Sequence, residues 1–278
     1  YEVGGFFKNL DNDLVHTDEF NLYTQVENTL NYTKSFGKHY VNALAGYTVY
    51  NNGFKSVVSS VSGIPDDIYV LAGAVQPAVT GYNLENNLVS YLGRAIYSYD
   101  SKYTLSATIR RDGSSRFSPD NKWGNFPSVS AAWGIGKETF FTNLKTPITD
   151  LKLRASYGVL GNQEIGDYQY LGLITSGISY GVGEPNTLWS GNIQTNSPGV
   201  GLKWESTETA DFGLDLDLWN GKVQYTFDYF NKQTSDLLLR VPIPLSVGSS
   251  ENPYTNAGNV TNKGYEMSLT YNEKIGDF

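Results

Sequence analysis

The chain has 278 residues, with 21 Tyr, 29 Gly, no Cys and a formal net charge of −8. The lack of cysteine excludes a disulfide scaffold and a thiolate metal site, and the acidic balance leaves no basic stripe to bind nucleic acid. No run reaches the ~18 apolar residues of a membrane helix, so hydropathy alone describes a soluble protein.

Apolar and polar residues alternate with a period of two along most of the chain, which is the pattern of strands with one apolar and one polar face. This pattern predicts strands at 20–33, 38–50, 88–99, 103–112, 126–136, 150–159, 204–219, 222–236 and 259–272. Residues 1–7 also have the pattern of a strand, 168–182 are a further candidate inside a loop, and 275–278 resemble the start of a strand.

The links between these strands alternate between shorter and longer segments. The shorter links are 35–37, 100–102, 137–149 and 220–221, and the longer links are 51–87, 113–125, 160–203 and 237–258. Short turns at one rim and long loops at the other are typical of bacterial outer-membrane barrels, and nothing in a soluble sandwich requires this asymmetry. The strands are also closer to the ~10 residues of a membrane barrel strand than to the ~5–6 of a soluble one.

In a membrane barrel the apolar face of each strand meets lipid and the polar face lines the lumen. The residues expected to face lipid are Leu105, Ile109, Leu214, Leu216, Phe227 and Tyr229. The residues expected to face the lumen are Arg110, Thr108, Asp215 and Asp228.

Several segments occur in an order that carries a family resemblance. They are 91–99 (YLGRAIYSY), 109–117 (IRRDGSSRF), 123–130 (WGNFPSVS), 151–158 (LKLRASYG), 161–163 (GNQ), 202–205 (LKWE), 228–233 (DYFNKQ) and 259–266 (NVTNKGYE). The ordered set resembles the barrel of the SusC/RagA family of TonB-linked outer-membrane transporters, over nearly the whole chain. One departure is Ile96, where the family pattern more often has a polar lumen residue.

The resemblance implies an all-β, antiparallel transmembrane β-barrel of roughly 22 strands, of which about ten would lie in this chain. It also implies a place in the outer membrane of a Gram-negative cell, in contact with its lipid, and import of an oligosaccharide or a peptide. The implied partners are a SusD-like surface lipoprotein and TonB. In the family a plug and a TonB box precede the barrel, so we expect both to lie outside residues 1–278, which would form part of the barrel domain.

Aromatic and charged residues on the expected outer loops are candidates for substrate contact. They are Trp123, Trp189, Tyr170, Tyr180, Arg116 and Asp112. The alternatives are loop packing and interfacial anchoring for the aromatic residues, and a salt-bridge network that fixes a loop for the charged ones.

Neither a catalytic residue nor a metal or cofactor site is expected. His16 and His39 are isolated from other ligand types, and the loop that starts at Asp11 has neither the Gly nor the final Glu of an EF-hand. Two other function classes remain open: an extracellular β-rich adhesin or structural module, and a β-rich glycan-active enzyme. The enzyme would need two facing carboxylates, and the sequence does not pair its acids.

Overall fold

The computed structural model describes residues 13–63, 70–71, 76–144, 146–183, 187–244, 246 and 252–273. The strand features expected at 1–7 and 275–278 lie outside these residues. Within the described ranges, no helix is long and apolar enough to cross a membrane.

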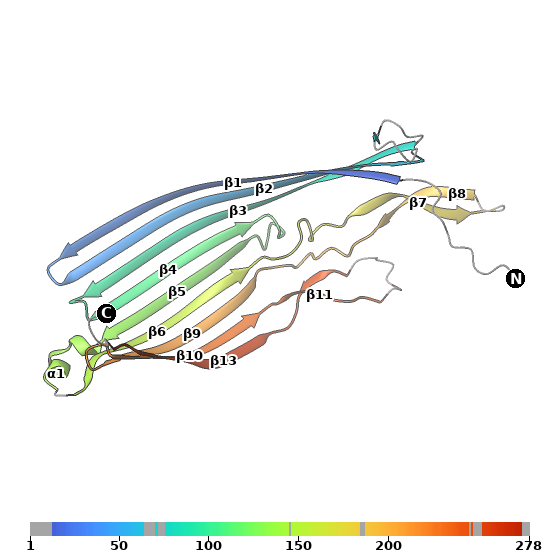
Figure 1. The fold of residues 1–278 in the computed structure, drawn as a ribbon. Coiled ribbons are helices and arrows are strands. Elements are labelled where there is room, and N and C mark those ends of the chain that lie inside the picture. Colours follow the sequence, from blue (N-terminus) through green and yellow to red (C-terminus); the bar gives the residue numbers. More distant parts are fainter. Residues whose placement is uncertain are drawn as a thin grey trace. The chain divides into compact units, whose positions relative to one another are not determined.

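Nine strands form one sheet, in the order β1-β2-β3-β4-β5-β6-β9-β10-β13 (Figure 1). Their bounds are β1 Asp13–Phe36, β2 His39–Ser62, β3 Gln76–Tyr99, β4 Tyr103–Ser114, β5 Trp123–Gly134, β6 Ile148–Asn162, β9 Glu205–Leu218, β10 Val223–Ser235 and β13 Val260–Tyr271. Two smaller sheets pair β7 Ile174–Val182 with β8 Thr187–Gln194, and β11 Leu238–Arg240 with β12 Tyr254–Asn256. The helical turns are η2 Ile135–Lys137 and α1 Thr139–Thr142.

All nine expected strands are present in the sheet. The first three are much longer than expected, at 24 residues each. The prediction that 51–87 is a long loop is therefore wrong over 51–62 and 76–87, where β2 and β3 continue. Asn51-Asn52-Gly53 has the composition of a turn, but these residues lie within a strand. The candidate strand at 168–182 corresponds to β7, whereas β8, β11 and β12 were not predicted.

The chain divides into two compact units. The first holds the described residues up to Gln25 and those between Tyr50 and Asn87, and the second holds 26–49 and the residues from Leu88 onward. Within the first unit, the rings of Phe54 and Tyr82 lie 5.8 Å apart. The second unit contains the short turns, the later strands and the loops considered below.

In the second unit the strand register separates two faces. Leu105 pairs with Ala131, Ile109 with Pro127, and Leu214 with Phe227, so apolar side chains share one side. We call this side the apolar face. Many of its side chains are exposed, including Leu105, Phe212, Met267 and Leu269. A belt of exposed apolar residues this wide suits contact with lipid rather than with water.

The opposite side, which we call the polar face, carries the four residues expected to face the lumen. The register runs from Thr108 through Ser128 to Gly158 and Thr209, and Arg110, Asp215 and Asp228 lie on the same side. The predicted division of the strands into two faces is thus present, and the exposure of this face to a lumen stays a prediction. Ile96 pairs with Ser106 and interrupts the polar face with an apolar side chain.

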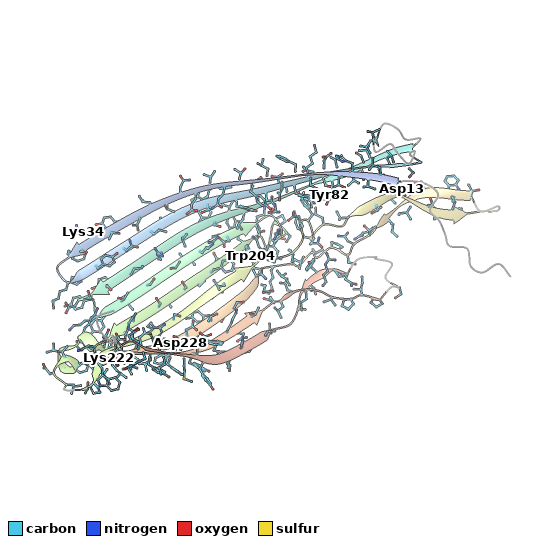
Figure 2. The ribbon with its side chains drawn as sticks, in the orientation of Figure 1. Asp13, Lys34, Tyr82, Trp204, Lys222 and Asp228 are labelled. Carbon is cyan, nitrogen blue, oxygen red and sulfur yellow. The ribbon has the colours of Figure 1, made fainter. Side chains whose placement is uncertain are left out.

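The second unit has two different rims. The short-turn rim holds the turns at 37–38, 100–102, 135–147 and 219–222, and α1 lies there (Figure 1). The long-loop rim holds the links after β4, β6 and β10. Figure 2 shows Trp204 at the long-loop end of the strands and Lys222 at the short-turn end. The turn expected at 220–221 spans four residues, with Trp219, Asn220 and Gly221 all at positive φ.

Candidate functional site

The long loops have a hydrophobic core of their own. Phe117 of the link after β4 is buried together with Ile165 and Leu202, which come from opposite ends of the long link between β6 and β9. Trp204, Leu238 and Tyr254 pack against this cluster. Because one cluster joins the links after β4, β6 and β10, the long-loop rim is a packed platform.

Arg116 fastens two of these loops together. Its Nε donates to Asp167 Oδ1 at 3.0 Å, its Nη1 donates to the Gln163 carbonyl at 3.3 Å, and its backbone N–H donates to Ser114 Oγ at 3.1 Å. The side chain is mostly buried. This geometry matches the alternative of a loop-fixing network, so Arg116 is not carried into the proposed substrate site.

Asp112 is buried and lies next to Arg110, whose Nε is 2.8 Å from both carboxylate oxygens. Both residues line a pocket of about 350 Å³ on the second unit, which we call the rim pocket. Its other lining residues are Leu88, Phe126, Leu160, Gly161, Asn162, Gln163, Glu164 and Trp204. The pocket joins charged, amide and aromatic groups, which is the mixture that recognises a polar organic ligand.

Two features of the rim pocket were missed by sequence reasoning. Trp204 belongs to the 202–205 motif, but the sequence alone gives it no functional role. In the structure its ring centre lies 5.2 Å from that of Phe117 and 5.3 Å from that of Phe126. Its Nε1 donates to the Lys122 carbonyl at 3.0 Å, which fixes the indole. Gln163 has a buried Oε1 atom with no hydrogen-bond partner in the structure. A donor from a ligand would satisfy that oxygen.

The β7–β8 hairpin brings two of the predicted aromatic residues together. Tyr180 pairs with Trp189 in the register, so both side chains point to one face, where they are 52% and 57% exposed. Asn196 fixes the base of the hairpin, because it accepts from the Leu173 N–H at 2.6 Å and donates to the Leu171 carbonyl at 2.9 Å. Tyr170 lies half-buried in the loop before this hairpin.

Trp123 has a different position from the one expected. The prediction that it lies in an outer loop is wrong, because β5 begins at Trp123 and pairs it with Gly113 on the apolar face. Gly113 has no side chain, so the indole ring lies over its backbone. The ring also stacks near Tyr91, at 6.1 Å, and beneath Arg111, at 5.0 Å. This placement matches the interfacial-anchor alternative rather than a sugar platform.

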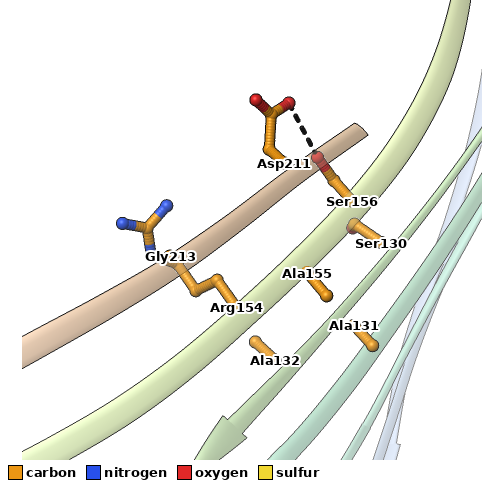
Figure 3. A pocket seen from close by; sticks show the side chains of 8 residues that line it. All are labelled: Ser130, Ala131, Ala132, Arg154, Ala155, Ser156, Asp211 and Gly213. Atoms are coloured by element: carbon orange, nitrogen blue, oxygen red, sulfur yellow. Dashed lines mark hydrogen bonds between the residues drawn. The ribbon is translucent and has the colours of Figure 1, made fainter. Parts of the chain in front are cut away.

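The middle of the polar face has a smaller pocket of about 180 Å³ (Figure 3). Small residues such as Ser130, Ala132 and Gly213 leave this space open, and Ser156 donates to Asp211 beside it at 3.3 Å. Arg154 also lines it. Among the described residues, no group of three or more His, Asp or Glu side chains is placed to hold a metal ion.

The two histidines have ordinary surroundings. His16 lies 3.2 Å from Asp18, and His39 Nδ1 lies 2.8 Å from the Tyr97 hydroxyl oxygen. Both agree with the interpretation as surface residues.

Comparison with known proteins adds a family match. The model of the family described as "TonB dependent receptor-like, beta-barrel" matches residues 3–278. TonB-dependent receptor P3 of Formosa agariphila is 40% identical over 250 residues, which are 88% of this chain and 24% of that protein. TonB-dependent receptor SusC of Bacteroides thetaiotaomicron is 34% identical over 256 residues, which are 90% of this chain and 24% of that protein.

Solved structures match as well. The structure of the RagAB peptide transporter superposes with a TM-score of 0.82 at 25% identity, over 94% of this chain and 29% of that chain. The RagAB peptide importer in its open-open state gives a TM-score of 0.79 at 25% identity, over 98% of this chain and 30% of that chain. The chain spans about a quarter of the length of the curated relatives it matches. These relatives are receptors and transporters, not enzymes.

Proposed function

Because the chain belongs to the TonB-dependent receptor-like β-barrel family of the outer membrane, we propose that it forms part of a nutrient importer. The polar face would line the import path and the apolar face would meet lipid. The observation that carries this proposal is the match of the family model over residues 3–278, together with the two-faced sheet of the second unit.

We propose that the parent protein imports an oligosaccharide or a peptide and works with a SusD-like surface lipoprotein. The relatives named SusC and RagAB support this choice, and one of them is described as a peptide transporter. Energy would come from TonB through a segment outside residues 1–278. A plug, likewise outside these residues, would fill the lumen, so the chain would be a part of the barrel domain.

The rim pocket is the proposed substrate contact of this chain. Arg110 is about half exposed and offers a cation, Glu164 offers a mostly exposed carboxylate, and Gln163 offers an unsatisfied amide oxygen. A peptide or a sugar chain presents donors and acceptors that these groups can pair with. The aromatic pair Tyr180 and Trp189 would add a stacking surface at the same rim.

Uptake by whole cells tests the proposal. Cells that express the parent protein receive labelled peptides or labelled oligosaccharides as separate substrates, and a strain without the parent gene sets the background. Arg110→Ala should lower uptake of one substrate class, because the pocket loses its cation. Unchanged uptake of both classes after loss of the parent gene would contradict the import function.

The aromatic hairpin has a matched control. Tyr180→Ala with Trp189→Ala should lower uptake of the same substrate class, because both rings leave one face of the hairpin. Leu188→Ala changes an exposed apolar residue on the opposite face of this hairpin and should leave uptake unchanged. Equal effects of these two sets of changes would remove the aromatic pair from the site.

A further inference from the structure

The link between β5 and β6 folds back over the apolar face at the short-turn rim. The Tyr103 hydroxyl donates to Glu138 Oε1 at 2.5 Å, and Trp133 Nε1 donates to the same oxygen at 3.2 Å. Tyr103 and Trp133 are partners in the register on the apolar face, and their rings stack 6.3 Å apart. The carboxylate of Glu138 therefore lies on the side of the sheet that bears the lipid-compatible belt.

A neighbouring lysine neutralises the negative charge of Glu138. Lys102 Nζ donates to its Oε2 at 3.0 Å, and the side chain is only 13% exposed. Hydrogen bonds from Tyr103, Lys102 and Trp133 lower the pKa of Glu138 to about 2. A carboxylate with three hydrogen-bond donors, one of which is the Lys102 cation, tolerates a partly apolar environment.

The residues after Glu138 expose large apolar side chains. Phe140 in α1 is 58% exposed and Leu144 is 55% exposed. Gly136 packs against the backbone of Asp150 and leaves no room for a Cβ atom, which keeps this link close to the start of β6. Polar contacts thus fix the position of the link, while Phe140 and Leu144 stay more than half exposed.

The neighbouring turn at 219–222 is hydrogen-bonded next to this link and also exposes an apolar side chain. The Trp219 N–H donates to the Pro147 carbonyl at 2.8 Å, and the Asn220 N–H donates to Thr149 Oγ1 at 2.7 Å. These bonds join the 219–222 turn to the end of the 135–147 link and to the start of β6. The Trp219 side chain is also exposed. Tryptophan is enriched where a membrane protein meets the headgroup region.

We propose that the segment 135–144 is an interfacial membrane element, with Phe140 and Leu144 inserted into the phospholipid leaflet next to the short-turn rim. The inference rests on the proposed barrel function, because it needs the apolar face to meet lipid. Lipid is the chosen occupant because the Glu138 contacts join the segment directly to the apolar face. An apolar helical segment that lies along the interface binds by the apolar area it buries.

The test uses the full-length parent protein without other cysteines, reconstituted in phospholipid vesicles. Phe140→Cys and Leu144→Cys are each labelled with a thiol-reactive bimane dye. Lipids brominated on the acyl chains report contact with the leaflet, and aqueous iodide reports contact with water. Leu105→Cys on the apolar face serves as the lipid-facing control, and Asp120→Cys in the link between β4 and β5 serves as the water-facing control.

The expected result is loss of dye fluorescence with brominated lipid at 140 and 144, comparable to the loss at 105 and absent at 120. Quenching of the dye at 140 and 144 by iodide alone, as at 120, would overturn the inference, because both side chains would then lie in water. If the dye at 105 is also insensitive to brominated lipid, the barrel assignment itself fails. The control at 105 therefore separates failure of this inference from failure of the proposed function.

Discussion

Arg154 of β6 donates from Nη2 to Asp228 Oδ1 of β10 at 2.9 Å, although β9 lies between their two strands. The register puts Gly213 of β9 opposite both residues, and its missing side chain leaves the space through which they meet. Arg154 Nε also donates to Asp215 Oδ2 at 2.9 Å. One guanidinium therefore bridges two carboxylates on the polar face.

Removing the Arg154 guanidinium should lower the free energy of unfolding more than removing the charge of one of its carboxylate partners. Arg154→Gln leaves Asp215 and Asp228 near each other without their shared cation, so we expect a loss of about 1–2 kcal/mol in unfolding free energy. Asp228→Asn keeps the pair between Arg154 and Asp215 and should cost about 1 kcal/mol or less. Denaturant unfolding of the parent barrel from lipid vesicles measures the unfolding free energy of both variants. A larger cost for Asp228→Asn would contradict this shared role.

Two adjacent residues in the middle of β5 test the assignment of the faces. Val129→Arg puts a cation on the apolar face and should destabilise the barrel by ~2–4 kcal/mol if that face meets the bilayer core. Ser130→Arg, at nearly the same depth, points to the polar-face pocket beside Asp211 and should cost much less. Leu216→Arg should also cost less than Val129→Arg, because Leu216 lies two residues from the end of β9. Equal tolerance at 129 and 130, measured by refolding into vesicles, would rule out the barrel orientation.

The strands of the sheet could be predicted from the sequence, because apolar and polar residues alternate along most of their length. Alternation from Tyr103 to Asp112, or from Val223 to Tyr229, has no other regular interpretation. The continuations of β2 and β3 could not be predicted, because Asn51-Asn52-Gly53 has the composition of a turn. In the structure, pairing with the neighbouring strands overrides this local propensity. The short strands β11 and β12 have three residues each, too few to show a period.

The candidate site could be predicted from the sequence only in part. Tyr180 and Trp189 were singled out as separate loop residues, and only the hairpin register brings them together. From the sequence, Trp204 cannot be distinguished from a packing residue, because its contacts are to Phe117 and Phe126, which lie more than 70 residues earlier in the chain. For Arg116 the sequence leaves two alternatives open, substrate contact and a salt bridge that fixes a loop, and its bond to Asp167 favours the second.

The contacts of Glu138 should make the short-turn rim sensitive to acid. Its pKa is lowered from an ordinary 4.5 to about 2, so the carboxylate stabilises the folded rim fully above pH 4.5 and loses this effect as the pH falls toward 2. Amide exchange at residues 139–144, corrected for its intrinsic pH dependence, should therefore accelerate over that pH range. Neutral pH should show slow exchange.

Glu138→Gln should remove this pH dependence and give fast exchange at 139–144 already at neutral pH, because Lys102 loses its nearer carboxylate partner and keeps only Asp100, at 3.7 Å. Glu164→Gln is the control, since Glu164 is mostly exposed on the other rim and should leave exchange at 139–144 unchanged. An unaltered pH profile in Glu138→Gln would show that another group holds the rim.

Phe117 should hold the long-loop rim in place. Its side chain is 0% exposed and packs with Ile165 and Leu202, so Phe117→Ala should cost ~3–5 kcal/mol within this cluster. Because the cluster lies beyond the strand ends, we expect the loops to loosen while the barrel still inserts. A protease added to intact cells should then cut the link after β4 or after β6 faster than in the unchanged protein. Leu188→Ala, at an exposed hairpin position, should leave the cleavage rate unchanged. If Phe117→Ala abolishes membrane insertion instead, the cluster is needed for folding of the sheet itself, and the loops are not an independent platform.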